Sequence, residues 1–162
     1  MKIPFYLPTR VRAPRALARL LFILAAAAFV LAGRAMATER WATLEAIHQI
    51  ENPRNTEEPG RYGELGPYQF RERTWRMHTL APFSGAVDRR LSDAVAVKHY
   101  DWLCSQLALR GVPVSPYSIA LAWNAGVRAV VNPNPPASAV DYASRAANIA
   151  AELLHGELAD AR

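Results

Sequence analysis

The sequence predicts an all-α fold, and three of its features lead to that prediction. Apolar residues recur every three or four positions in several segments, which is the spacing along one face of a helix. Residues that start and stop helices flank these segments; for example, Ser115 and Pro116 start one that Gly126 ends. No segment alternates apolar and polar residues for long enough to predict a sheet. We therefore expect one all-α domain of about five to seven helices.

Residues 1–37 have the composition of a signal peptide, so the folded domain is expected to comprise residues 38–162. This leader holds six basic residues and no acidic one, and an apolar run occupies positions 20–32. Ala35 and Ala37 are the small residues that signal peptidase accepts, which predicts cleavage after Ala37. We expect export to the periplasm or cell envelope.

An uncleaved N-terminal anchor is the alternative for the same segment. The apolar run has 13 residues, fewer than the roughly 20 that a membrane span needs, which favours cleavage. Membrane contact is expected only through this segment, if it stays uncleaved.

The net positive charge of the chain comes from residues 1–37. The whole chain has a formal net charge of +5, whereas residues 38–162 hold 13 Lys and Arg against 14 Asp and Glu. Nucleic-acid recognition needs a positive surface that neutralises phosphates. The sequence therefore predicts no nucleic-acid partner.

The first two helices of the domain are expected at 41–51 and from Pro67 toward Arg76. Asn52-Pro53 ends the first, because the residue before a proline avoids the α region. A glycine-containing loop leads to Pro67, a residue common in the first turn of a helix.

Capping residues predict three further helices. Ser92 is a predicted N-cap for a longer helix that Gly111 stops, and Ser115 caps a helix that ends at Gly126. The proline-rich segment 132–136 must be a loop. The last helix is expected to start at Ser138 and to end before Gly156.

Neither a metal nor a cofactor is predicted. The lone Cys104 cannot form an intrachain disulfide, and we expect it to lie buried on a helix rather than to act as a nucleophile with His99. The four histidines lack metal-ligand spacing; they are His48, His78, His99 and His155.

Glu51 is the candidate catalytic residue, an acid at the C-terminal end of an apolar helix. The helix dipole disfavours an anion at that end, and an apolar setting raises a carboxyl pKa through desolvation. Both effects keep a proton on the group near neutral pH, as a general acid requires. The alternative is an ordinary solvated side chain.

Two further segments supply candidate binding groups. Gly63 and Gly66 permit a tight backbone turn near a ligand, and Gln69 is expected to place an amide in the helix turn that follows. In the second segment, Trp123 and Asn124 lie at a helix end beside small residues, where an amide can orient a sugar. Each segment could instead be a plain turn or a helix stop.

Taken in this order, the segments resemble the soluble lytic transglycosylase (SLT) domain of the lysozyme-like superfamily. In that family Glu-Ser closes a helix, a Gly-x-x-Gly-Leu-Met-Gln turn follows, and Ala-Tyr-Asn-Ala-Gly and a late helical Tyr come after it. The matching segments here are Glu51-Asn52, 63–69, 122–126 and Tyr142, and the resemblance spans roughly residues 42–150.

The match has departures. Asn52 stands for Ser, Pro67-Tyr68 for Leu-Met, and Trp123 for Tyr. The segment 66–70 also looks like part of invertebrate-type lysozymes, which are rich in disulfides, whereas this chain has one cysteine. These departures affect the subfamily and the fit to substrate more than the fold.

The resemblance implies a lysozyme-like fold and cleavage of the MurNAc-GlcNAc β-1,4 bond of peptidoglycan without a cofactor. Its single acid, here Glu51, protonates the leaving oxygen and then deprotonates the muramoyl C6 hydroxyl, which forms 1,6-anhydromuramoyl ends. The implied substrate-binding residues are Gly66, Tyr68, Gln69, Trp123, Asn124 and Tyr142.

Other functions stay open on the same fold. A hydrolytic muramidase would need a second carboxylate roughly 6.5–9.5 Å from the first, and the loop offers Glu57, Glu58 and Glu64. A non-catalytic glycan-binding or assembly module, or a helper of a secretion or conjugation apparatus, is also compatible with the sequence.

The basic residues Arg71, Arg73 and Arg76 near Trp75 have two interpretations. They form either a solvated helix face with Trp75 packed inward or a contact for acidic stem peptides. The solvated face is the favoured interpretation.

Overall fold

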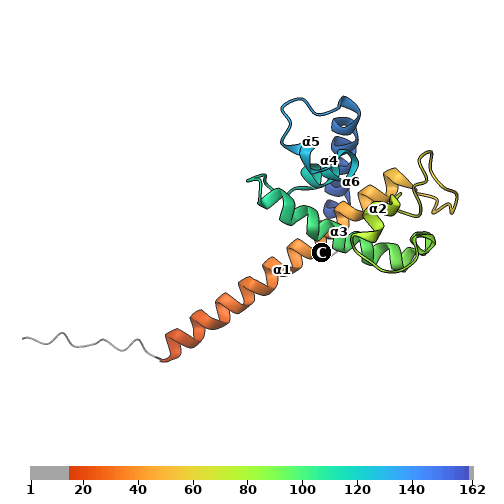
Figure 1. Cartoon of the computed structure of the whole chain (residues 1–162). Coiled ribbons are helices and arrows are strands. Elements are labelled where there is room, and N and C mark those ends of the chain that lie inside the picture. Colours follow the sequence, from red (N-terminus) through yellow and green to blue (C-terminus); the bar gives the residue numbers. More distant parts are fainter. Residues whose placement is uncertain (1–14, 161–162) are drawn as a thin grey trace, which may run out of the picture. The chain divides into compact units, whose positions relative to one another are not determined.

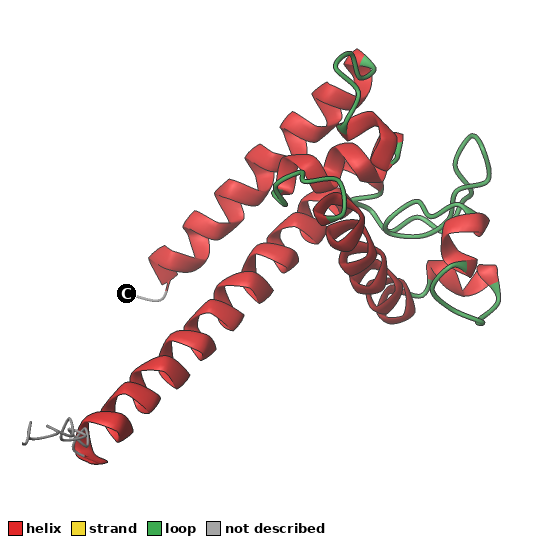
Figure 2. Cartoon of the chain, turned by 60° about the vertical axis from the view of Figure 1, so that its left-hand side comes forward, coloured by secondary structure: helices red, strands yellow, loops and turns green. Residues whose placement is uncertain are grey.

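The computed structural model describes residues 15–160 and is all-α, as predicted (Figure 1). Its elements are α1 (Arg15–Glu51), α2 (Glu72–Arg76), the 3-10 helix η1 (Phe83–Val87), α3 (Arg89–Ala108), α4 (Pro116–Ala125), α5 (Val127–Val130) and α6 (Ala137–Asp160). Figure 2 shows only helices and loops across these residues. The one β-bridge among the described residues is an isolated antiparallel pair, Leu65 and Phe70.

The chain divides into two compact units, Met1–Met36 and Ala37–Arg162. The boundary falls one residue before the predicted cleavage site. The described part of the first unit is the N-terminal portion of α1. Its exposed large apolar side chains include Phe22, Ile23, Leu24, Phe29, Val30 and Leu31.

The helix segment Phe22–Glu51 is long and apolar enough to cross a membrane, judged by length and composition. The 13-residue run was expected to be too short for this. The difference arises because the helix continues without a break through residues 33–51. A signal sequence passes the same criterion, so both interpretations of the leader stay open. Part of the predicted basic region, Lys2, Arg10 and Arg12, lies outside the described residues.

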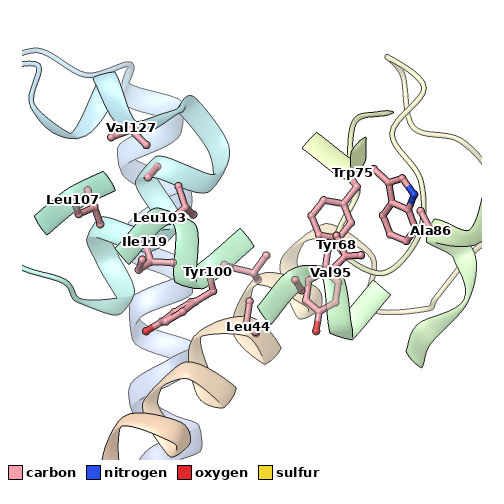
Figure 3. Close-up of a cluster of buried hydrophobic side chains, with 14 residues drawn as sticks. Leu44, Tyr68, Trp75, Ala86, Val95, Tyr100, Leu103, Leu107, Ile119 and Val127 are labelled. Atoms are coloured by element: carbon pink, nitrogen blue, oxygen red, sulfur yellow. The ribbon is translucent and has the colours of Figure 1, made fainter. Parts of the chain in front are cut away.

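In the second unit, the last turns of α1 separate two hydrophobic clusters. Leu44 and Ile47 face the first cluster, which is formed with α3, α4 and the segment 68–87 (Figure 3). Its largest fully buried side chains are Trp75, Ile47, Leu103, Leu107 and Ile119. Burial of each such side chain stabilises a fold by about 1.5–3 kcal/mol. The end of α1 is therefore fixed by packing.

Alanines form the opposite face of the same helix. Ala42 and Ala46 are fully buried in the second cluster, against α4 and α6. Their small side chains let three helices approach closely, and α4 packs along α6. Tyr142 of α6 belongs to this cluster and so comes near the end of α1.

The prediction of a helix that starts at Pro67 is wrong. Residues 65–70 instead form a tight turn closed by the bridge between Leu65 and Phe70, and α2 starts only at Glu72. Gly66 and Gln69 have positive φ angles of 77° and 46°, which a right-handed helix excludes. Gly66 is required here, since a Cβ at this position would collide with the carbonyl of Ala86.

Three other helix boundaries were also predicted wrongly, at the start of α3 and at both ends of α6. The N-cap of α3 is Asp88, whose carboxylate accepts the Leu91 N–H at 2.7 Å, while Ser92 is buried inside the helix. Helix α6 starts at Ala137, before Ser138, and continues through Gly156 to Asp160. One glycine costs a helix only about 1 kcal/mol, which does not suffice to stop it.

The boundaries of α4 are confirmed. Ser115 caps it with a capping box, Pro116 occupies the first turn, and Gly126 ends it with φ 83°. The segment 132–136 is a loop, as predicted. The short helices η1 and α5 were not predicted, because four or five residues are too few to show a helical period.

Candidate functional site

A cavity of about 520 Å³ opens beside the C-terminal end of α1 in the second unit. Its walls come from the loop 60–71, from α3 and from the end of α4. Five of the candidate catalytic and binding residues from the sequence lie on it: Glu51, Glu64, Gln69, Trp123 and Asn124. Segments far apart in the sequence thus meet at one site.

Glu51 is the last residue of α1, and its carboxyl group is directly held by Tyr142 of α6. The Tyr142 hydroxyl donates a hydrogen bond of 2.8 Å to Glu51 Oε1, across 91 positions of sequence. Burial raises the pKa of Glu51, the Tyr142 hydrogen bond opposes that rise, and the nearby charge of Glu64 adds to it. The net result is a pKa above the ordinary glutamate value. Burial likewise raises the pKa of Tyr142, so the phenol stays a hydrogen-bond donor.

Asn52 anchors the loop that follows the candidate acid. Its side-chain amide donates to the carbonyls of Thr56 and Gly66 at 2.9 and 3.2 Å, and its oxygen accepts the Thr56 N–H at 3.0 Å. The side chain is 5% exposed, so these bonds form away from water. Asn52 therefore joins the helix end to the 65–70 turn.

Gln69 reaches the cavity from the tight turn and not from a helix, contrary to prediction. Its amide Nε2 donates to the carbonyl of Gly66 at 3.0 Å. Gly60 faces it, and a Cβ on Gly60 would come within 2.6 Å of Gln69 Oε1 and 2.8 Å of Glu64 Oε2. The absence of a side chain at Gly60 leaves room for both polar groups.

Trp123 and Asn124 line the cavity from the last turn of α4. The Trp123 ring packs edge-on against His99, with centroids 4.8 Å apart, and contacts Phe70 at 5.5 Å. Asn124 is exposed, and the amide has no role as a helix cap because Gly126 terminates α4. Its side chain is thus available to a ligand.

Glu64 is the one loop carboxylate of the three candidates that lines the cavity; Glu57 and Glu58 are exposed and do not. Its Oε2 accepts the Tyr62 N–H at 2.8 Å and its Oε1 accepts Arg71 Nε at 3.2 Å. Desolvation favours the neutral acid, but these hydrogen bonds and the Arg71 charge outweigh it and lower the pKa. The site therefore combines one carboxyl of raised pKa with one of lowered pKa.

Three predicted binding residues do not line this cavity: Tyr68, Gly66 and Tyr142, and Tyr142 reaches the site only through its hydrogen bond to Glu51. Tyr68 is 3% exposed, and its hydroxyl donates to Asp93 Oδ1 at 2.7 Å. Its side chain borders a different cavity of about 260 Å³, so it is not a wall of the Glu51 site. Gly66 acts through its carbonyl, which accepts from Asn52 and Gln69. The structure thus places Tyr68 in the core, while Gly66 supports the turn through its backbone carbonyl.

Three cavity residues were missed by the sequence reasoning or given another role. Arg61 was not considered, and Arg71 was assigned to a solvated face. His99 was considered only as a partner of Cys104, but its Nδ1 contacts His78 Nε2 at 2.9 Å. Burial and the neighbouring His78 lower the pKa of His99 to about 4, so it is neutral at ordinary pH. No sequence signal marks a histidine pair 21 residues apart.

Cys104 lies on α3 as predicted but is half-buried, and burial raises its thiol pKa. Trp75 is fully buried, as the solvated-face interpretation requires. Among the described residues, no group of three or more His, Cys, Asp or Glu side chains is placed to hold a metal ion.

Comparison with protein-family models, with curated proteins and with solved structures finds no match to this chain. The case for a function therefore depends on the site residues themselves.

Proposed function

We propose that this protein is a peptidoglycan-cleaving lytic transglycosylase in which Glu51 is the single catalytic acid and base. One observation carries the proposal: a carboxyl group with a raised pKa lies in a cavity and accepts a hydrogen bond from Tyr142. A general acid near neutral pH needs such an environment.

The proposed reaction needs no second carboxylate. Glu51 donates its proton to the glycosidic oxygen between MurNAc and GlcNAc, and the bond to the muramoyl C1 breaks. The resulting carboxylate then accepts the proton of the muramoyl C6 hydroxyl, whose oxygen closes the 1,6-anhydro ring. The Tyr142 hydroxyl would hold the carboxyl group in place and stabilise it while it is ionised.

Neighbouring groups suit a sugar ligand. Trp123 offers an aromatic surface, and the amides of Gln69 and Asn124 can bond hydroxyl and N-acetyl groups. The N-terminal helix is compatible with export, and we propose the periplasm or cell envelope as the location, where the glycan strands of peptidoglycan are found.

Hydrolysis by a muramidase mechanism is the second candidate, and Glu64 favours it. This carboxylate lines the same cavity and stays ionised because its pKa is lowered. A carboxylate in that state can activate a water molecule on the far side of the sugar. Arg71 and the Tyr62 N–H already bind both Glu64 oxygens, which favours a supporting role and hence the first candidate.

Mass spectrometry of the soluble products separates these reactions. The full-length protein, purified in mild detergent, and its Glu51→Gln variant would be incubated with purified sacculi, with Glu57→Gln as the matched control. We expect 1,6-anhydro-muropeptides from the parent and the control, and a loss of at least about 10²-fold in Glu51→Gln. Reducing ends would instead identify a hydrolase.

Release from neither protein, with sacculus binding intact, would favour a non-catalytic glycan-binding or assembly module. A helper of a secretion or conjugation apparatus would show the same chemistry as the first proposal. Co-purification with components of such an apparatus would be its distinguishing result.

A further inference from the structure

Two guanidinium groups border the cavity, and the proposed cleavage chemistry does not use them. Arg61 and Arg71 both line it, on the loop between α1 and α2. A glycan backbone presents neutral hydroxyl and N-acetyl groups, which do not require cations. The two arginines therefore point to another part of the ligand.

One aromatic ring positions both arginines. The guanidinium carbons of Arg61 and Arg71 lie 5.4 and 5.5 Å from the centroid of the Tyr62 ring, within the range of cation–π attraction. The Tyr62 side chain is itself 69% exposed. An exposed aromatic ring that holds two cations beside it forms a surface that can bind an anion.

The hydrogen-bonding capacity of these groups is largely unused. Arg71 donates through Nε to Glu64, and within residues 15–160 its two terminal nitrogens make no hydrogen bond. Arg61 forms neither a hydrogen bond nor an ion pair with the described part of the chain. Five N–H donors in a planar fork match a carboxylate in two-point contact.

The balance of charged side chains on the cavity also favours an anionic ligand. Besides Glu51, the charged side chains that line the cavity are Arg61, Arg71 and Glu64, and Glu64 offsets only one of the two cations. By contrast, Arg76 on α2 is paired with Glu72 at 2.7 Å and does not line the cavity. The excess positive charge is thus local to the cavity mouth.

We propose that Arg61 and Arg71 form a subsite for the carboxylates of peptidoglycan stem peptides. The substrate class is then peptide-bearing, anionic glycan rather than bare glycan. The identity of the ligand depends on the proposed function, whereas the anion preference follows from the two arginines and Tyr62. Tyr62 holds the guanidinium groups, and Glu64 fixes the Nε side of Arg71.

The test measures binding, so that it does not depend on cleavage. The full-length Glu51→Gln protein in mild detergent would be titrated with two preparations of sacculi, both with acetylated amines. In one, the stem-peptide carboxylates are also converted to amides with a carbodiimide and glycinamide. At low ionic strength we expect tighter binding to the carboxylate-bearing preparation by about threefold to tenfold.

Variants of the two arginines test whether these residues cause the preference for carboxylate-bearing sacculi. Introduced into the Glu51→Gln protein, Arg61→Gln and Arg71→Gln are each expected to bring the affinity ratio toward one. Arg73→Gln, on the exposed face of α2 and outside the cavity, should leave it unchanged. Equal affinity for both preparations, or a ratio unaffected by Arg61→Gln and Arg71→Gln, would overturn the subsite.

Cleavage of sacculi by the parent protein is measured in the separate product assay described above, so that the two proposals can fail independently. Anhydro products without a binding preference would retain the proposed function and overturn the subsite. A preference lost in both arginine variants, without any product, would retain the subsite and overturn the proposed function.

Discussion

The carboxyl group of Glu51 is under two opposing influences from its neighbours. The Tyr142 hydroxyl donates to it and stabilises its anion, while the charge of Glu64 in the same cavity destabilises that anion. Burial adds to the second effect and is the largest cause of the raised pKa. Removing one neighbour at a time should therefore move this pKa in opposite directions.

Tyr142→Phe is expected to raise the Glu51 pKa further, because the carboxylate loses a hydrogen-bond donor. Glu64→Gln is expected to lower it, because a negative neighbour is removed; the one amide oxygen of Gln can still accept from either Arg71 Nε or the Tyr62 N–H. Titration of the ¹³C carboxyl resonance of Glu51 measures both shifts without any substrate. Shifts of the same sign in the two variants would contradict this account of the site.

A second prediction at this scale concerns stability. Folded Glu51 binds its proton more tightly than unfolded glutamate does, so the folded state loses stability as pH rises through its folded-state pKa. Glu51→Gln removes this cost and should stabilise the protein at pH 8. At pH 3, below the ordinary glutamate pKa of about 4.3, the carboxyl is neutral in both the folded and the unfolded chain and the gain should vanish. Urea denaturation at the two pH values tests this, and a gain independent of pH would contradict it.

At the scale of single elements, the 65–70 turn determines which side chains reach the cavity. It brings Gln69 to the site and buries Tyr68, and Asn52 ties it to the end of α1. Gly66 gives the turn its geometry, with a positive φ and no space for a Cβ beside the Ala86 carbonyl. Gly63 has nearly the same φ but open space around its Cβ position.

These two glycines form a matched pair. Gly63→Ala should cost only the strain of a left-handed conformation, about 1–2 kcal/mol. Gly66→Ala adds a collision with backbone, so the free energy of unfolding should fall by about 1–3 kcal/mol more. Chemical denaturation of the two variants measures the difference. Equal losses would show that the approach to Ala86 is not a constraint on this turn.

The helices with strong end signals could be predicted from sequence, whereas the tight turn could not. Ser115, Pro116 and Gly126 act locally, so α4 was placed correctly. The prediction of a helix from Pro67 failed because the bridge to Phe70 and the contact with Ala86 involve tertiary partners.

The site was partly predictable for the same reason. Glu51, Gln69, Trp123 and Asn124 lie in short segments of specific composition, and all four line the cavity. Arg61 could not be found in this way, because its position depends on how the loop folds over the cavity.

At the scale of the whole chain, the N-terminal segment and the folded domain differ in the exposure of their apolar side chains. Residues 22–36 of α1 expose their large apolar side chains, whereas from Ala42 onward the same helix contributes buried residues to two clusters. Apolar exposure of this kind is unfavourable in water and suits a targeting or membrane-associated segment. Neither hydrophobic cluster of the domain includes a residue from 22–36.

Processing of the leader is therefore the expected fate of the full chain. Expressed in a bacterial host, the protein should be recovered from the periplasm with Thr38 as its first residue, because Ala35 and Ala37 meet the signal-peptidase requirement for small residues. Ala37→Arg should block cleavage and leave the 17.9 kDa chain in the membrane fraction, whereas Ala42→Ser, beyond the site, should not affect it. Intact-mass spectrometry of the two fractions measures the outcome. A full-length parent in the membrane would identify the segment as an anchor, and the proposed reaction with peptidoglycan would then be restricted to glycan strands within reach of the membrane surface.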